Sequence, residues 1–139
     1  MTERRSTPTD RSPERAVTDL TPSRQLIEAI AIAADDRQAG DIAILDVSNV
    51  SYLADYFAIV TGFSKAQVRA IADAIEKQVA AQCGQNPLRV EGKTEGSWVV
   101  LDYGDAIAHI MLPSEREFYS LEAFWGHAER LELPVLLGD

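Results

Sequence analysis

Three side chains in one short segment of the sequence could do chemistry together. Asp102 and Asp105 lie on either side of Gly104, and His109 follows soon after. Two carboxylates this close could hold a magnesium ion or act as a general acid and a general base. They could equally cap a tight turn, because an Asp side chain often accepts a hydrogen bond from the backbone around such a turn. Turn capping is the interpretation we favour, so we expect no metal site, no cofactor and no enzymatic activity.

Two further side chains, those of His109 and Cys83, are weaker candidates for a chemical role. His109 shares an expected strand face with Ile107 and Met111, which is typical of a structural histidine whose hydrogen bonds are satisfied, and the sequence shows no partner for it. Cys83 is the only cysteine, so no intrachain disulfide can form, and no basic residue nearby would favour its thiolate. A reducing cytoplasm fits this cysteine usage.

The segment from Thr61 to Ser64 could bind phosphate, because it would place a Gly- and Ser-containing turn at the start of a helix. The sequence lacks a Walker motif and a G-x-G-x-x-G motif. Ser64 followed by Gln67 instead matches a helix-capping pair. We therefore interpret the turn as a helix cap.

The stretch from Trp98 to Leu101 puts large apolar side chains on both faces of one expected strand. If helices cover only one face of the sheet, the other face is an exposed protein-binding patch rimmed by Asp102 and Asp105. If helices cover both faces, these side chains are core residues. The residue pattern alone leaves both alternatives open.

Periodicity and capping residues predict the elements that position these side chains. Thr21 and Pro22 begin a helix, Gly84 ends the next one, and Gly104 turns a hairpin. We expect a helix, two strands, a helix, three strands and one or two short helices, at 22–38, 42–47, 55–61, 64–82, 88–91, 98–103, 105–111 and 114–125. This order indicates an α/β or α+β fold in which helices cover a five-stranded sheet.

The composition indicates one domain with tails. Residues 1–20 have few apolar side chains, which predicts a disordered tail, and residues 131–139 form a second tail, so that the domain spans 21–130. The net charge of −9 argues against a direct grip on nucleic acid, which depends on Lys and Arg. No run is long and apolar enough for a membrane-spanning helix, so we expect a cytoplasmic protein.

From Ser23 to Arg130 the sequence resembles the Iojap or ribosomal silencing factor family. The resemblance rests on two blocks of residues in matching order. The first comprises Asp46-Val47-Ser48, Asp55-Tyr56-Phe57, Thr61-Gly62 with Ser64, and Gln67 to Ala72. The second comprises Glu91-Gly92, Gly96 to Val99, Leu101 to Asp105, His109-Ile110, Glu115 to Tyr119, Leu121-Glu122 and Trp125-Gly126.

The resemblance implies a mixed sheet flanked by helices, similar to the nucleotidyltransferase fold but without its catalytic Asp-x-Asp motif. It also implies binding to large-subunit ribosomal protein fourteen, which blocks joining of the ribosomal subunits and represses translation when nutrients are scarce. Relatives of this kind are homodimers when free. The interface positions that carry over to this sequence are Trp98, Val100, Leu101, Asp102, Tyr103 and Asp105.

The resemblance favours the exposed patch over the fully covered sheet, and we expect Trp98 to be an exposed anchor whose truncation leaves folding nearly unchanged. Two alternatives remain at the sequence level. One is a large-subunit assembly factor that uses the same docking site. The other is a metal-dependent, nucleotidyltransferase-like enzyme built on Asp102, Asp105 and His109.

Overall fold

The computed structural model describes residues 21–124, 128–133 and 136. Their helices are α2 (Pro22–Asp36), α3 (Lys65–Cys83), α4 (Pro113–Tyr119) and α5 (Leu121–Phe124). The strands are β1 (Gly40–Asp46), β2 (Tyr56–Thr61), β3 (Arg89–Glu91), β4 (Trp98–Asp102), β5 (Ala106–Met111) and β6 (Glu129–Leu131). None of the helices in these ranges is long and apolar enough to cross a membrane.

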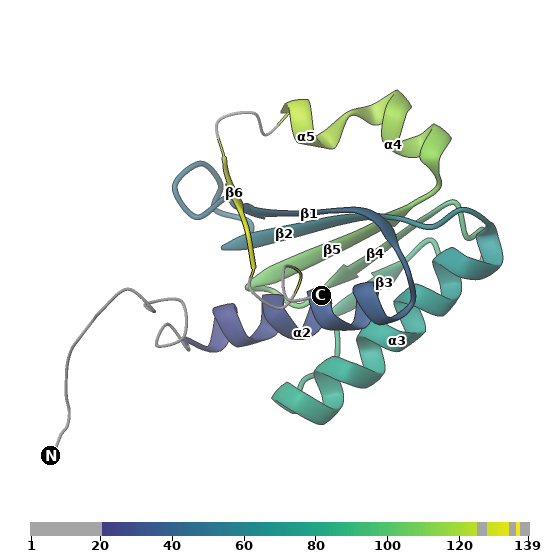
Figure 1. Ribbon diagram of the computed structural model, residues 1–139. Coiled ribbons are helices and arrows are strands. Elements are labelled where there is room, and N and C mark those ends of the chain that lie inside the picture. Colours follow the sequence, from purple (N-terminus) through teal and green to yellow (C-terminus); the bar gives the residue numbers. More distant parts are fainter. Residues whose placement is uncertain (1–20, 125–127, 134–135, 137–139) are drawn as a thin grey trace, which may run out of the picture.

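The strands form one mixed sheet in the order β3-β4-β5-β2-β1-β6. β2 and β5 are parallel, and every other neighbouring pair is antiparallel. α2 and α3 pack on one face of the sheet, and α4 and α5 lie on the other (Figure 1). The predicted α/β class, with a mixed sheet flanked by helices, is confirmed, although the described residues form six strands where five were expected.

The helix α2 begins and ends close to the predicted positions. The side chain of Thr21 accepts a hydrogen bond from the backbone N–H of Arg24, and Pro22 occupies the first turn. The helix ends at Asp36 because Gln38 has a φ of 61°, a left-handed conformation that cannot continue a right-handed helix. The next strand, β1, begins at Gly40.

The helix α3 is capped at both ends by the residues that the sequence indicates. The Ser64 hydroxyl accepts a hydrogen bond from the Gln67 N–H at 3.0 Å, and the Gln67 side chain accepts one from the Phe63 N–H at 2.8 Å. Gly84 ends the helix with a φ of 66°. The helix buries one apolar stripe completely, which comprises Val68, Ile71, Ala72, Ile75 and Val79.

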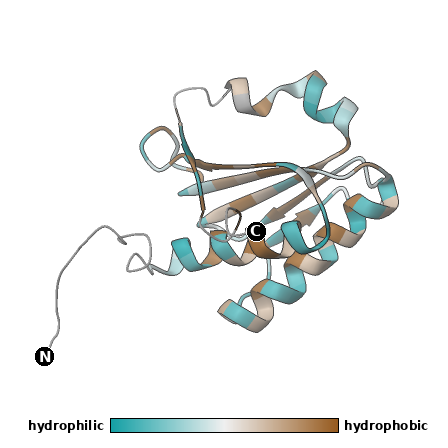
Figure 2. Ribbon diagram, in the orientation of Figure 1, coloured by the Kyte–Doolittle hydropathy of each residue, from teal (hydrophilic) through white to brown (hydrophobic). Residues whose placement is uncertain are grey.

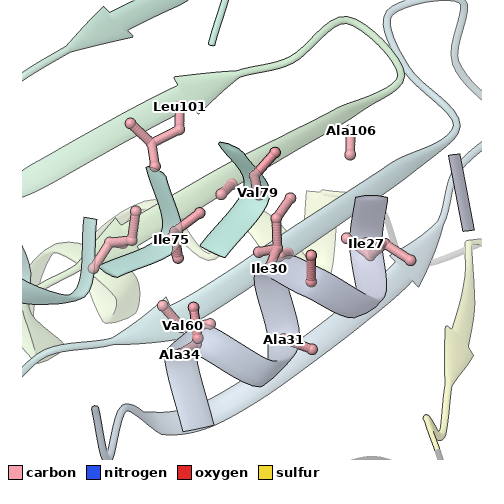
Figure 3. Packing of buried hydrophobic residues seen from close by; sticks show 14 of the residues in the cluster. Ile27, Ile30, Ala31, Ala34, Val60, Ile75, Val79, Leu101 and Ala106 are labelled. Carbon is pink, nitrogen blue, oxygen red and sulfur yellow. The ribbon is translucent and has the colours of Figure 1, made fainter. Parts of the chain in front are cut away.

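The main core lies between the sheet and the pair of helices α2 and α3. Figure 3 shows Ile75 of α3 close to Leu101 of β4, with Ile30 and Ile27 of α2 farther along the same buried layer. Figure 2 agrees with this placement of the core, because apolar residues lie on the strands and on the sheet-facing side of α2. β4 is therefore fixed on one side by a dry, closely packed layer.

The second face of the sheet has a smaller buried cluster, formed by Ala43, Leu45, Val47, Ala54, Phe57, Ile59 and Met111. α4 covers it incompletely, since none of the seven described residues of that helix is buried. The predicted start of this helix at Ser114 is wrong. Leu112 occupies the cap position without a side-chain hydrogen bond, and Pro113, whose fixed φ suits the first helical turn, begins the helix.

The strand β6 was not expected from the sequence. Its three residues pair with β1, where Leu131 lies opposite Ile44. Two of the three are exposed, so the segment lacks the apolar alternation that predicts a strand. Leu133 is fully buried in the main core, so packing continues past residue 130, where the sequence pattern had placed the end of the domain.

Candidate functional site

The strand β4 divides the predicted interface residues between the two faces of the sheet. Side chains alternate along a strand, so Trp98, Val100 and Asp102 share the face that α4 only partly covers, which we call the open face. Leu101 is 0% exposed and Tyr103 is 4% exposed, and both pack in the main core. The expectation that these two side chains supply contact area for a partner is wrong, because α2 and α3 cover their face of the sheet.

Trp98 is half-buried at the edge of the second cluster. Its indole Nε1–H donates a hydrogen bond to Nδ1 of His109 at 3.1 Å. The indole also lies against Tyr119 of α4, with ring centroids 4.8 Å apart. Trp98 is thus an anchored surface residue, and the expectation of a freely exposed anchor is wrong. Its truncation will cost folding stability as well as any binding.

His109 is the hydrogen-bond partner of Trp98 that the sequence did not reveal. Its ring lies 5.4 Å from Phe57 of β2 in an edge arrangement and 5.9 Å from Trp98, measured between centroids. Burial lowers the pKa of His109 to about 4, so the imidazole is neutral at pH 7. Because Nδ1 accepts the bond from Trp98, the ring proton lies on Nε2. Cross-strand register could have suggested this pair, since His109 lies opposite Val100, two residues from Trp98 on the same face.

Two adjoining grooves open on this face, and Glu91 and Val100 line both. The first groove, of about 420 Å³, is lined by apolar residues that include Phe57 and Ile107, and by the ion pair of Arg89 and Asp102. The second, of about 500 Å³, is lined by Trp98 and Tyr119 and by the carboxylates of Glu91, Glu95 and Glu115. An apolar and aromatic surface with an acidic rim is suited to a partner that presents apolar and basic side chains.

The carboxylate of Asp102 binds other groups of the same chain. Its Oδ1 accepts a hydrogen bond from the Gly104 N–H at 2.8 Å, and its Oδ2 lies 3.4 Å from Nη2 of Arg89. Turn capping, the favoured interpretation of this residue, is therefore confirmed. Asp105 has an exposed side chain, and its carbonyl accepts hydrogen bonds from the N–H groups of Asp55 and Tyr56. Within the described residues, no three His, Cys, Asp or Glu side chains gather as a metal site would require.

The loop between β3 and β4 is pinned to α3, which fixes the acidic side of the second groove. The Arg69 guanidinium donates to the carbonyls of Lys93 and Thr94 at 2.9 and 2.7 Å. The Lys93 ammonium in turn lies 2.6 Å from Asp73 and 2.8 Å from Glu76. These contacts join residues far apart in the sequence. Helical periodicity predicts that Arg69 and Asp73 face away from the core, but it does not predict their partners.

The turn before α3 acts as a helix cap, as expected, through Ser64 and Gln67. Thr61, at the end of β2, makes a separate contact: its hydroxyl accepts a hydrogen bond at 2.9 Å from the guanidinium of Arg116 in α4. This contact ties α4 to the end of β2.

Burial raises the pKa of the Cys83 thiol, which keeps it protonated at neutral pH.

The model of one protein family, described as ribosomal silencing factor during starvation, matches residues 21–137. The chain belongs to the ribosomal silencing factor family. The predicted family is thereby confirmed, and the match includes the whole open face and both grooves.

Named relatives and a solved structure agree with this membership. The ribosomal silencing factor of Bacillus subtilis is 40% identical over 110 residues, which is 79% of this chain and 92% of that protein. The chloroplastic protein Iojap of Arabidopsis thaliana is 37% identical over 89% of this chain and 51% of its own length. A mouse protein named mitochondrial assembly of ribosomal large subunit protein 1 is 34% identical over 63% of this chain and 39% of its own length. A crystal structure from Bacillus halodurans matches with a TM-score of 0.70 and 34% identity, covering 79% of this chain and 99% of that one.

Proposed function

We propose that this member of the ribosomal silencing factor family acts in the cytoplasm as a non-enzymatic inhibitor of subunit joining. It binds the large ribosomal subunit through ribosomal protein fourteen and occupies the surface that the small subunit would contact. Translation is thereby repressed when nutrients are limiting. The observation that carries the proposal is the open face of β4, where Trp98 and Val100 lie at the two adjoining grooves.

The composition of the open face supports a protein partner. Interface hot spots are enriched in aromatic residues held in well-packed surroundings, and Trp98 is fixed by both His109 and Tyr119. Leu53, which is 67% exposed, adds apolar surface at the first groove. Steric exclusion needs no chemistry beyond docking, so a bound protein of this size would be sufficient to block the small subunit.

The charges of the face support a basic partner. Glu91 is exposed, and it lines the second groove together with Glu95 and Glu115. The whole chain carries a net charge of −9, so the proposed contact is with a ribosomal protein, and RNA phosphates would be repelled. Exposed carboxylates of this kind steer association more than they hold the finished complex.

Binding can be tested with one charge placed on either face of the sheet. Val100→Arg introduces a bulky cation between the grooves, where it would repel a basic partner. Val90→Arg is the matched control, because Val90 is 40% exposed on the neighbouring strand and lies opposite Leu101, on the helix-covered side. We expect Val100→Arg to weaken binding to isolated ribosomal protein fourteen by at least about tenfold, a loss of roughly 1.4 kcal/mol, and Val90→Arg to leave it within about twofold. Equal affinities of the two variants would reject the open face as the docking surface.

A second candidate function is large-subunit assembly at the same site, which the name of the mouse relative favours. The two roles differ in which particles the protein accompanies. An assembly factor would cosediment with immature large subunits in growing cells, and its depletion would lower the yield of mature large subunits. A silencing factor would cosediment with mature large subunits in starved cells.

We also propose that the free protein is a homodimer, as the family resemblance implies. Light scattering coupled to size-exclusion chromatography measures the mass directly. A mass of one chain, 15.3 kDa, across the working concentration range would reject the dimer.

A further inference from the structure

We propose that His109 is a positioning residue for Trp98, whose indole it holds in the orientation that the ribosomal partner meets. The inference rests on the proposed function, because it assigns a task to His109 within the same docking site. His109 touches the partner-binding tryptophan and acts through it.

The geometry makes His109 the rigid support of the indole. Its strand, β5, is paired with β4 on one side and with β2 on the other, so the imidazole has a fixed base. Tyr119, which also contacts the indole, belongs to a seven-residue helix with no buried residue in its described length. The hydrogen bond from Nε1 of Trp98 to Nδ1 of His109, at 3.1 Å, therefore links the indole to the most firmly held element beside it.

The chemistry of the imidazole suits this task. Nδ1 can accept the indole N–H only while it carries no proton. Burial disfavours the charged ring and lowers the pKa of His109 to about 4. The edge contact with Phe57 fixes the plane of the imidazole from the far side. Phe57, His109 and Trp98 thus form a chain of contacts across three neighbouring strands.

Fixing an anchor side chain before binding lowers the entropy lost when the complex forms. The usual ordering cost for one side chain corresponds to about a three- to tenfold change in Kd. A side chain that served only as packing material would affect the folding equilibrium and would leave the indole orientation unchanged. The hydrogen-bond acceptor is therefore the property to vary.

Two substitutions of nearly equal size separate the acceptor from the packing. In His109→Asn the amide oxygen can stand close to the position of Nδ1, whereas His109→Leu has no acceptor. We expect His109→Asn to bind ribosomal protein fourteen within about twofold of the wild type, and His109→Leu to bind about three- to tenfold more weakly. His109→Met also lacks an acceptor and adapts to irregular spaces, so it replaces the leucine variant if that protein does not fold.

A spectroscopic measurement on the free protein tests the positioning without the partner. The indole Nε1–H signal of Trp98, observed by nuclear magnetic resonance and assigned by comparison with Trp125→Phe, reports on the hydrogen bond. We expect this signal to keep its position and its protection from solvent exchange in His109→Asn, and to lose both in His109→Leu or His109→Met. An indole signal that is the same in all of these variants would overturn the positioning role.

The two measurements distinguish failure of this inference from failure of the proposed function. If the wild type does not bind ribosomal protein fourteen, the proposed function fails, and the indole signal alone decides whether His109 holds Trp98. If the wild type binds, and the variants without an acceptor bind equally well, the inference is wrong while the proposed function stands.

Discussion

Lowering the pH from 7 towards 4 is expected to destabilise the fold through His109. The pKa of this side chain falls from its ordinary 6.5 to about 4 in the folded protein, because burial disfavours the imidazolium. Between these two values the unfolded chain binds a proton that the folded chain does not, so the free energy of unfolding falls as the pH falls. At about 1.4 kcal/mol per pH unit, His109 removes about 3 kcal/mol by pH 4 and little more below it.

A loss of this size is measurable, because the folding free energy of a domain is about 5 to 15 kcal/mol in total. Urea unfolding at several pH values between 7 and 4 would be compared for the wild type and His109→Asn, which cannot titrate in this range. The two proteins share every other titratable side chain, so the contributions of those side chains cancel in the comparison.

The expected result is a wild type that loses about 3 kcal/mol more than His109→Asn between pH 7 and pH 4. The steepest part of the difference should lie between the two pKa values. Parallel pH dependences of the two proteins, or a folded-state midpoint near 6.5 for the His109 ring signals, would refute the reasoning from burial.

Three further predictions follow from single features of the structure. The Tyr103 hydroxyl is buried without a hydrogen-bond partner among the described residues, so Tyr103→Phe should raise the free energy of unfolding by about 1 kcal/mol, and a loss would contradict this. Gly92 has a φ of 84°, and an added Cβ would lie 2.0 Å from a backbone carbonyl of β4, so Gly92→Ala should cost more than about 2 kcal/mol in urea unfolding. Gly84→Ala, at a φ of 66° with open space around it, should cost only about 1 kcal/mol, and equal costs would remove the steric argument. Replacing Asp102 and Asp105 together by Asn should slow association with ribosomal protein fourteen and weaken its salt dependence, which stopped-flow kinetics at two ionic strengths would check.

Local signals in the sequence predicted most of the fold. Ser64 with Gln67, Gly84 and Gly104 each act where they were expected, because caps and tight turns depend on residues that are neighbours in the chain. β6 was missed for the opposite reason. Its place at the sheet edge depends on pairing with β1, more than 80 positions earlier in the sequence, and on burial of Leu133.

The candidate site was only half predictable. Alternation along β4 separates Trp98 from Leu101, but it does not tell which face the long helices cover, and that choice placed Leu101 and Tyr103 in the core. The hydrogen bond between Trp98 and His109 depends on the register of two strands, which the types of these two residues do not predict. The clamp of Arg69 on the loop after β3 depends in the same way on tertiary packing.

We propose that the open face docks on the large subunit and thereby excludes the small subunit. Light scattering of mixed purified subunits measures their joining directly, with the wild type, Val100→Arg and Val90→Arg added at equal concentrations. We predict that the wild type and Val90→Arg block joining in proportion to their occupancy of the large subunit, and that Val100→Arg does not. Normal joining of large subunits saturated with the wild type, or a full block by Val100→Arg, would contradict the claim.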